Sequence, residues 1–171
     1  MSQKAPTFGE CIDKREIASI FGIIDADIAN EFPVQWVSTG LEAVIIPLTS
    51  REALRAVKVN KEAFKTYVDK HPACNCNHLF FVQEGATQLS ARCLMEDFVE
   101  DPATGSANGD LAGYLLHHNY FNASDITYTV YQGEDMGRVS VLQVHAQYKS
   151  TDEWVIEVGG TCHIVASGDW L

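Results

Sequence analysis

The sequence predicts one α+β domain in which a mostly antiparallel β-barrel surrounds a central α-helix. The first observation is a helical pattern over Gly105–His118, where apolar residues recur at three- and four-residue spacing. The second is a stripe of glycines on another face of that helix, at positions 105, 109 and 113. The third is a series of short apolar or alternating segments joined by short turns, which is typical of antiparallel strands.

The glycine stripe is the strongest sign that the helix is enclosed. Each glycine inside a helix costs about 1 kcal/mol relative to alanine. A gain elsewhere must offset this cost, and the physical gain that glycine offers is close approach of another backbone or of a ligand. We therefore expect a strand or a ligand to lie nearly against the helix backbone along this stripe.

The other elements follow from local patterns, taken in chain order. Capping residues and apolar spacing predict three covering helices, at Asp13–Phe21, Ser50–Ala56 and Asn60–Asp69. Alternation and short apolar runs predict the strands Pro33–Val37, Leu41–Leu48, Leu79–Val82, Gln88–Glu96, Ile126–Tyr131, Val139–Ala146, Trp154–Val158 and Thr161–Ala166. No repeat or long linker divides residues 1–171, so we expect a single domain.

Composition excludes several classes of function. The chain has 171 residues and 46% hydrophobic residues, which suits one soluble domain with a real core. Lys and Arg number 12 and Asp and Glu number 23, which gives a net charge of −11. This charge repels phosphate backbones and anionic membranes, so neither nucleic acid nor membrane is an expected partner. No signal peptide or membrane span is visible, and a cytoplasmic location is expected.

The cysteines do not indicate a disulfide framework or a metal site. Their number is five, and we expect reduced thiols. The stretch from His71 to His78 contains two histidines together with Cys74 and Cys76, which raises the question of zinc. Cys-x-Cys spacing fits a structural zinc site poorly, and no matching pair follows, so we expect no metal. The alternative is a loop whose cysteines are buried as small apolar residues.

The segment before the central helix has two chemical interpretations. The backbone N–H groups of Gly105, Ser106 and Ala107 at a helix start form a potential anion site, with Asp101 at its mouth. Asp101 is then either a cap that the helix dipole stabilises or an acid that exchanges protons with a bound ligand. The sequence leaves both open.

Four acids fall within six positions next to this site, namely Glu96, Asp97, Glu100 and Asp101. They form either a solvated rim or part of an acidic cleft. Spacing alone does not choose between these two interpretations.

Four stretches, in order, resemble the PhzF-like phenazine-biosynthesis isomerase family. Residues 100–109 read Glu-Asp-Pro-Ala-Thr-Gly-Ser-Ala-Asn-Gly, which resembles the family signature. The stretches Val37–Leu41, Tyr131–Arg138 and Val158–Gly168 are similar to family segments in the same order. The resemblance spans nearly the whole chain, yet it corresponds to only the second half of a family member.

This resemblance implies a fold and an activity. Such proteins have the diaminopimelate epimerase-like fold, with two similar barrel domains and substrate in the cleft between them, and they use no cofactor. Asp101 would be the catalytic acid that relays a proton, and Gly105, Ser106 and Ala107 would bind a substrate carboxylate. The family's proton-moving glutamate is expected on a first half that has no counterpart in residues 1–171.

A comparison with the related diaminopimelate epimerases and proline racemases argues against a mechanism with two thiols. Those enzymes are expected to use a cysteine just before the equivalent Gly-Ser or Gly-Thr, whereas this chain has Thr104. A threonine hydroxyl is too weak an acid to replace a thiolate base, so two-thiol racemisation is not expected.

The sequence is therefore compatible with three classes of function. The first is an isomerase domain that works on a small carboxylic acid once a separate N-terminal half, or a second copy in a homodimer, completes the cleft. The second is a non-catalytic domain that binds carboxylates. The third is a truncated remnant of a longer isomerase.

Overall fold

The structure is a computed structural model that describes residues 1–95, 98–150 and 153–169. The strands are β1 (Thr7–Ile12), β2 (Val34–Ser38), β3 (Glu42–Pro47), β4 (Asn77–Gly85), β5 (Gln88–Leu94), β6 (Glu100–Asp101), β7 (Asp125–Gln132), β8 (Ser140–Ser150) and β9 (Glu153–Gly159). The α-helices are α1 (Lys14–Phe21), α2 (Arg51–Ala56), α3 (Lys61–Lys70) and α4 (Gly105–His117), and short 3₁₀ turns lie at η1 (Asp25–Asp27) and η2 (Pro72–Cys74).

A single curled sheet holds all the strands. Its order is β1-β2-β3-β4-β5-β7-β8-β9, with β6 paired to β5. The sheet is mixed, because β3 with β4 and β5 with β7 are parallel pairs, while the other pairs are antiparallel. The α+β class is as predicted, but the sequence did not reveal the parallel pairs. Each of them is joined by a helical crossover, which a rule based on short turns misses.

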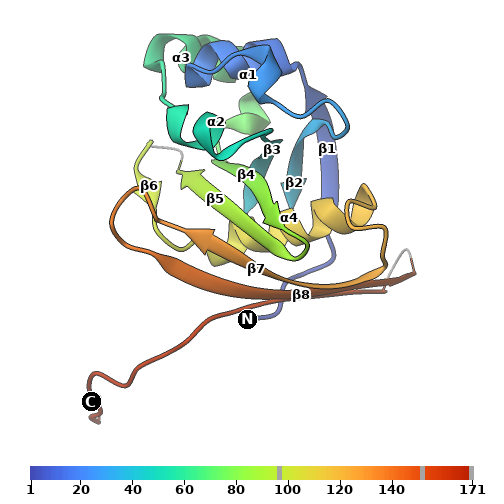
Figure 1. Cartoon of the computed structure of the whole chain (residues 1–171), viewed down its shortest axis with the longest axis vertical. Helices are drawn as coiled ribbons and strands as arrows, with labels where there is room; N and C mark the ends of the chain where they lie inside the picture. Colours follow the sequence, from blue (N-terminus) through green and yellow to red (C-terminus); the bar gives the residue numbers. More distant parts are fainter. Residues whose placement is uncertain (96–97, 151–152, 170–171) are drawn as a thin grey trace.

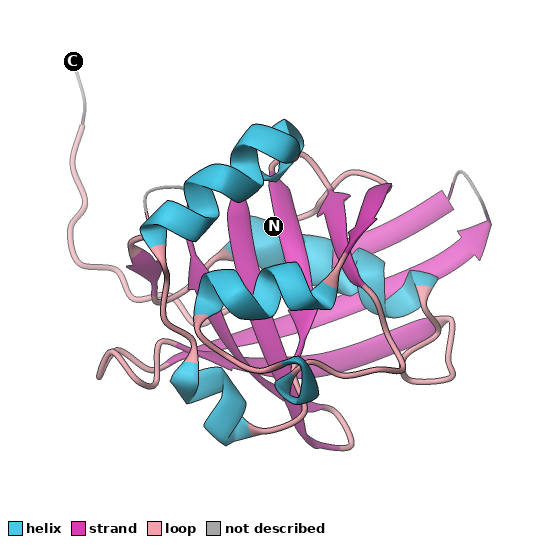
Figure 2. Ribbon diagram, turned by 90° about the horizontal axis from the view of Figure 1, so that it is seen from above, coloured by secondary structure: helices cyan, strands magenta, loops and turns pink. Residues whose placement is uncertain are grey.

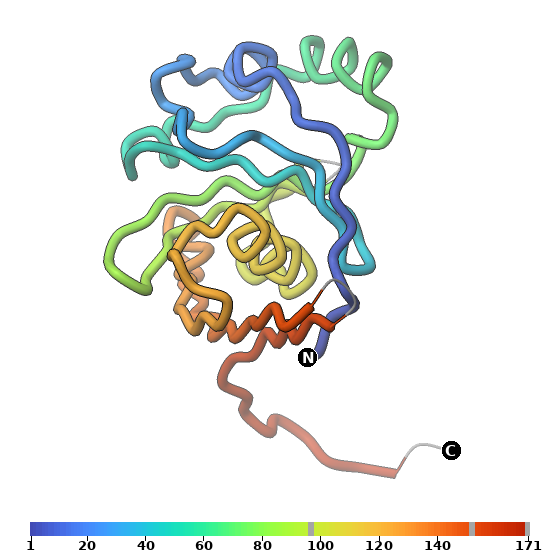
Figure 3. The backbone as a smooth tube through the Cα atoms, turned by 90° about the vertical axis from the view of Figure 1, so that its right-hand side faces the viewer, coloured from blue at the N-terminus to red at the C-terminus, as the bar shows by residue number. Residues whose placement is uncertain are grey.

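The sheet curls around α4 and carries the other helices on its opposite face. Figure 3 shows α4 in yellow with strands on several sides of it. Figures 1 and 2 show α1, α2 and α3 grouped on the far side of the strands from α4. Two apolar cores result, one between the sheet and α4 and one between the sheet and the covering helices.

Strand β3 shows how the sequence encodes both cores. Ala43 and Ile45 belong to the core around α4, whereas Val44 and Ile46 belong to the core under the covering helices. All four side chains are fully buried. A strand covered on both faces reads as a continuous apolar run, as this stretch does in the sequence.

Helix α4 is buried almost all round. Residues 107–116 are all buried, which includes polar Asn108 and Asp110. The predicted helix is confirmed, although it ends at His117, with His118 as its C-cap. None of the described helices is long and apolar enough to cross a membrane.

The glycine stripe lies against the first residues of the chain. A Cβ atom on Gly109 would be 2.6 Å from Cγ of Gln3, and one on Gly113 would be 2.8 Å from Cβ of Pro6. We call residues 1–6 the N-terminal strap. The predicted close approach is confirmed, but the neighbour is this strap and not one of the strands expected from the sequence.

The strap also connects β9 to the residue that follows β2. The backbone N–H of Gln3 donates to the carbonyl of Ile156 (2.9 Å), and the N–H of Val158 donates to the carbonyl of Met1 (2.9 Å). On its other side, the N–H of Lys4 donates to the carbonyl of Thr39 (3.3 Å). The strap therefore bridges β9 and the end of β2 while it crosses α4.

Three strand predictions were wrong or incomplete. Strands β1 and β6 were not predicted. The strand expected at Thr161–Ala166 is absent, because β9 ends at Gly159 and the following residues leave the body of the protein as an extended tail (Figure 1). Ile164 and Val165 are 93% and 96% exposed, so their alternating pattern has no described strand beside it.

Candidate functional site

The site predicted from the sequence lies where β6 turns into α4. Asp101 ends β6, whose pairing with Cys93 of β5 fixes this strand against the sheet. Pro102 then interrupts the backbone hydrogen bonding, and α4 starts at Gly105. The carboxylate of Asp101 is half-buried beside the first turn of the helix.

The hydroxyl of Thr104 holds the carboxylate of Asp101 and does not cap the helix. It occupies the N-cap position, but its hydroxyl makes no capping hydrogen bond to the helix. The hydroxyl instead donates to Oδ2 of Asp101 (2.8 Å). The N–H of Ala103 donates to Oδ1 of the same carboxylate (3.4 Å). Both oxygens of Asp101 are therefore held by the turn, which orients the carboxylate at the helix start.

The first three N–H groups of α4 precede its ladder of helical hydrogen bonds. The first helical bond runs from the N–H of Asn108 to the carbonyl of Thr104 (3.1 Å), so the N–H groups of Gly105, Ser106 and Ala107 precede it. Gly105 and Ser106 are partly exposed, whereas Ala107 is fully buried. A ligand outside the helix would therefore meet Gly105 and Ser106 first.

A buried amide pair supports this turn and was missed in the sequence. Oε1 of Gln132 accepts from the side chain of Asn108 (2.9 Å) and from the N–H of Thr104 (3.4 Å). Nε2 of Gln132 donates to the carbonyl of Asp101 (2.7 Å) and to Oγ1 of Thr104 (3.0 Å). Gln132 and Asn108 have no exposed surface. Gln132 thus ties the end of β7 to the turn that carries Asp101.

The sequence contained an ambiguous sign of the hydrogen bonds that Gln132 makes. Gln132 lies within the stretch Tyr131–Arg138 that resembles the family, directly before Gly133. A polar residue at an inward position of a strand indicates a buried hydrogen-bond network. Its partners lie 24 and 28 residues away in sequence, and no local pattern identifies them.

The loop after β7 packs on the same turn. Gly133 has a φ of +76°, and a Cβ atom there would be 2.5 Å from the carbonyl oxygen of Arg138 and 3.0 Å from Cα of Pro102. A side chain at this position would displace both segments. The loop from Gly133 to Arg138 therefore braces the Asp101 turn, while Arg138 itself is exposed.

The acidic cluster predicted around Asp101 is not one unit. Glu100 forms a two-point ion pair with Arg92, with distances of 3.0 Å and 2.8 Å. Arg92 also donates to the carbonyls of Leu54 (2.9 Å) and Val57 (3.2 Å), so this pair joins the sheet to the carboxyl end of α2 and its C-cap. Glu96 and Asp97 lie outside the described residues.

A hollow adjoins the exposed side of the helix start. Its volume is about 650 Å³, and its lining includes Ala103 and Gly105 from the turn and Met1 from the strap. The remaining lining residues come from β8 and from the end of β9 with its tail, namely Val139, Ser140, Val141, Leu142, Val158, Gly159, Gly160, Thr161 and Cys162. The volume is in the range of small-molecule sites.

A second carboxylate, Asp110, lies inside α4, and the sequence analysis did not predict a role for it. Asp110 is fully buried, and its Oδ1 accepts from the N–H of Thr39 (2.6 Å) and from the Thr39 hydroxyl (2.7 Å). Its Oδ2 has no hydrogen-bond partner among the described residues. Burial raises the pKa of Asp110 to about 7, although the two bonds from Thr39 oppose this rise.

The His71–His78 stretch belongs to the core under the covering helices. Cys74 and Cys76 are buried, and His78 is 1% exposed with its pKa lowered to about 4 by burial. His71 instead faces Glu10 (3.1 Å) and Glu16 (3.3 Å) near the surface. The described residues contain no group of three or more His, Cys, Asp or Glu side chains able to hold a metal. All five cysteines are unpaired.

These features define an α+β protein in which a curled sheet surrounds a buried helix and a carboxylate is held beside the start of that helix. The chain belongs to the family described as phenazine biosynthesis-like protein (PhzC-PhzF), which it matches over residues 1–168. The resemblance seen in the sequence is therefore confirmed.

Three relatives illustrate this membership. An uncharacterized isomerase, YddE, from Escherichia coli K12 is 26% identical over 99% of this chain and 59% of its own length. A trans-2,3-dihydro-3-hydroxyanthranilate isomerase from Pseudomonas fluorescens is 30% identical over 94% of this chain and 54% of its own. A crystal structure of a PhzF-family protein from Bacillus anthracis has a TM-score of 0.80 at 23% identity, over 94% of this chain and 56% of its own. The chain thus spans less than two thirds of each relative.

Proposed function

We propose that this protein is a PhzF-like isomerase domain that moves a proton on a small carboxylic acid. The observation that carries the proposal is the oriented carboxylate of Asp101 beside the N–H groups of Gly105 and Ser106. The names of relatives support the reaction class, because several are called isomerases and one is named for a hydroxyanthranilate.

The residues have distinct roles in this proposal. The N–H groups of Gly105, Ser106 and Ala107, with the Ser106 hydroxyl, hold the substrate carboxylate, because a helix start favours negative charge. Asp101 relays the proton, and the Thr104 hydroxyl orients it. A cofactor has no role in this scheme.

The proposal also includes a second protein surface. The base that takes the proton from carbon must come within hydrogen-bond reach, and we propose that it comes from a separate N-terminal half or from a second copy of this chain. The hollow beside Gly105 supports this idea, because its rim exposes apolar side chains. Met1, Val139 and Val141 are 68%, 61% and 45% exposed. We place this assembly in the cytoplasm, in keeping with five unpaired cysteines.

Binding and turnover need separate tests. Aromatic carboxylic acids such as anthranilate, added at millimolar concentration, should shift the backbone amide NMR signals of Gly105 and Ser106. Absence of such shifts would mean that the start of α4 does not bind carboxylates. The isolated chain should show little turnover of trans-2,3-dihydro-3-hydroxyanthranilate, and robust turnover by a demonstrated monomer would contradict the need for a second surface.

A second function from another class is a carboxylate-binding domain without catalysis. The firmly held Asp101 turn and the open helix start would serve binding equally well. Carboxylate binding without turnover, even when a first-half domain from a relative is added, would favour this alternative. Turnover that appears only when the first-half domain is added would favour the isomerase. The same result is expected if the chain is a truncated remnant of a longer isomerase.

A further inference from the structure

A second cavity lies at the carboxyl end of α4, away from the Asp101 turn. Its volume is about 450 Å³, and its six lining residues are Pro6, Phe8, Leu116, His117, Tyr148 and Trp154. Helix α4 has 13 residues, so its two ends are about 18 Å apart at 1.5 Å per residue. The cavity is therefore separate from the helix start, and it has the size of a small-molecule site.

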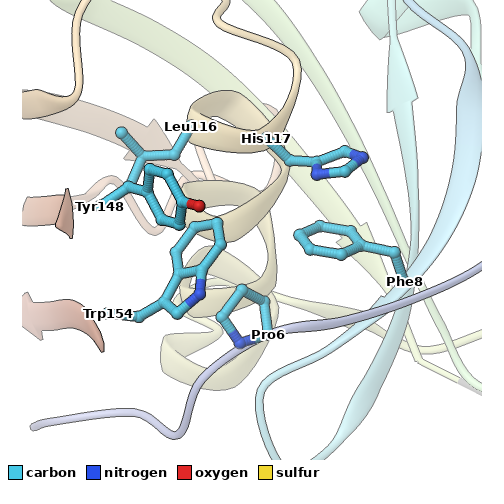
Figure 4. Close-up of a pocket in the computed structure, with 6 residues that line it drawn as sticks. All are labelled: Pro6, Phe8, Leu116, His117, Tyr148 and Trp154. Carbon is cyan, nitrogen blue, oxygen red and sulfur yellow. The ribbon is translucent and has the colours of Figure 1, made fainter. Parts of the chain in front are cut away.

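Aromatic rings form the two walls of this cavity. Phe8 and His117 are stacked on one side, with ring centroids 4.0 Å apart and planes at 21°. Tyr148 and Trp154 pack together on the other side, with centroids 4.6 Å apart. Figure 4 shows these two pairs facing each other, with Leu116 coming from the helix and Pro6 lying below.

The spacing of the rings limits the shape of a ligand. The centroids of Phe8 and Trp154 are 6.2 Å apart, with planes inclined at 51°. A flat ring sandwiched between two others needs about 7 Å, which is twice the optimal carbon–carbon separation. A flat ligand therefore does not fit between Phe8 and Trp154. A rounded group is thicker than a flat ring, so it would not lie between these two rings either, but it can lie over the faces of the inclined rings and touch several of them at once.

Electrostatics favours a positive charge on that group. The six lining residues include no Asp, Glu, Lys or Arg. Aromatic faces carry partial negative charge and attract cations within about 6 Å of the ring centroid. The carboxyl end of a helix is also the negative end of its dipole, and the whole chain carries a net charge of −11. The nearby Lys149 is paired with Glu153 at 2.9 Å.

We propose that this cavity binds the alkylated ammonium group of a small organic cation. The methyl groups lie over the inclined ring faces inside the cavity, and the positive charge lies against those faces. Leu116 supplies the apolar back of the cavity. The assignment is independent of the carboxylate chemistry proposed for Asp101, because different residues at the other end of α4 carry it.

The direct test compares two probes of equal shape and different charge, choline and 3,3-dimethylbutan-1-ol. Binding to the full chain is followed by NMR through the indole N–H of Trp154 and the ring protons of Tyr148. We expect choline to bind at least about tenfold more tightly, which corresponds to ~1.4 kcal/mol and lies in the range of cation–π interactions. Equal affinity for both probes, or no shift with either at millimolar concentration, would overturn the proposal.

A pair of variants localises the binding. Tyr148→Leu removes a ring from a side chain that is 38% exposed, and it should weaken choline binding about tenfold if the ring contributes cation–π attraction. Phe98→Leu is the matched control, because Phe98 packs on Phe64 in the other core. Unchanged affinity in Tyr148→Leu would place the site elsewhere. Nuclear Overhauser contacts from the N-methyl protons to Phe8 and Tyr148 in the unmodified protein check the same point without a variant.

Discussion

At the scale of single residues, Asp101 and Asp110 show how position decides the behaviour of a carboxylate. Asp101 is half-buried, and the turn donates to both of its oxygens. Asp110 lies only nine residues later, yet it is fully buried and has one oxygen without a described partner. The first can meet a ligand at the surface, whereas the second titrates inside the core.

Substitution of Asp101 separates its role in binding from its role in proton transfer. Asp101→Asn keeps an oxygen that can accept from Thr104 but removes a negative charge next to the anion site. We expect carboxylates to bind more tightly, because like-charge repulsion is lost. Turnover of the complemented enzyme should fall by roughly 100-fold or more, as for loss of a general acid or base.

Calorimetric titration with anthranilate and a turnover assay measure the two effects. Glu100→Gln is a useful control, because Glu100 is paired with Arg92 and is not directed at a ligand in our proposal. Unchanged turnover in Asp101→Asn would remove Asp101 from the mechanism.

Asp110 should make the free energy of unfolding depend on pH. Its pKa is raised from 3.8 to about 7, so the folded state keeps a proton that the unfolded state has released. The stabilisation is complete below about pH 4 and is lost as pH rises through 7. The whole shift corresponds to roughly 4 kcal/mol. Asp110→Asn should remove this loss while its side-chain oxygen still accepts from Thr39.

Urea unfolding of both proteins between pH 4 and 8 provides the measurement. His78 and His118 act in the opposite direction, because burial lowers the pKa of each to about 4. The informative quantity is therefore the difference between the protein and its variant at each pH. Asp69→Asn, at an exposed carboxylate, is the control. Parallel curves for the protein and Asp110→Asn would contradict the prediction.

At the scale of elements, the prediction succeeded where the signal was local. The apolar spacing of α4 and the apolar run of β3 are visible in consecutive residues, and the helix and the strand that they predicted were both confirmed. The parallel pairs and the contacts of Gln132 depend on residues far apart in sequence, so they were not visible. In the tail after Gly159, a local pattern gave a wrong prediction. Its residues alternate as in a strand, but no described strand lies beside them to pair with.

The contact between α4 and the strap predicts an unusual effect of alanine. Gly→Ala in an exposed helix stabilises by about 1 kcal/mol. Gly113→Ala should instead destabilise by about 1–2 kcal/mol, because the new Cβ would lie 2.8 Å from the rigid ring of Pro6. Thermal unfolding measures the change.

A double-mutant cycle identifies the cause of this effect. Pro6→Gly removes both atoms that the new methyl group would meet, Cβ and Cγ of Pro6, so Gly113→Ala should cost less in that background. Additive effects of the two substitutions would show that the strap does not press on the helix at Gly113.

At the scale of the whole molecule, the apolar rim predicts pairing. Val139 and Val141 are exposed beside the hollow at the helix start. Such surfaces are usually hidden in an assembly, and two-fold pairs are the commonest form. Light scattering across a dilution series should therefore give a mass above 18.9 kDa at high micromolar concentration.

Charge on the rim should reverse this pairing. Val141→Asp is expected to return the mass to 18.9 kDa, whereas Ile24→Asp is expected to leave the assembly intact. Ile24 is 66% exposed but lies near α1, on the side of the covering helices. A mass that stays at 18.9 kDa for the unmodified chain, with no partner co-purifying, would count against pairing.

The N-terminal strap has a consequence for how the protein is made. Met1 is hydrogen-bonded to Val158, 157 positions later, so this contact forms only after Val158 has left the ribosome. Until then, the strap covers neither the glycine face of α4 nor the inner face of the sheet. Contacts this distant in sequence slow folding, and uncovered apolar surface invites aggregation during the delay.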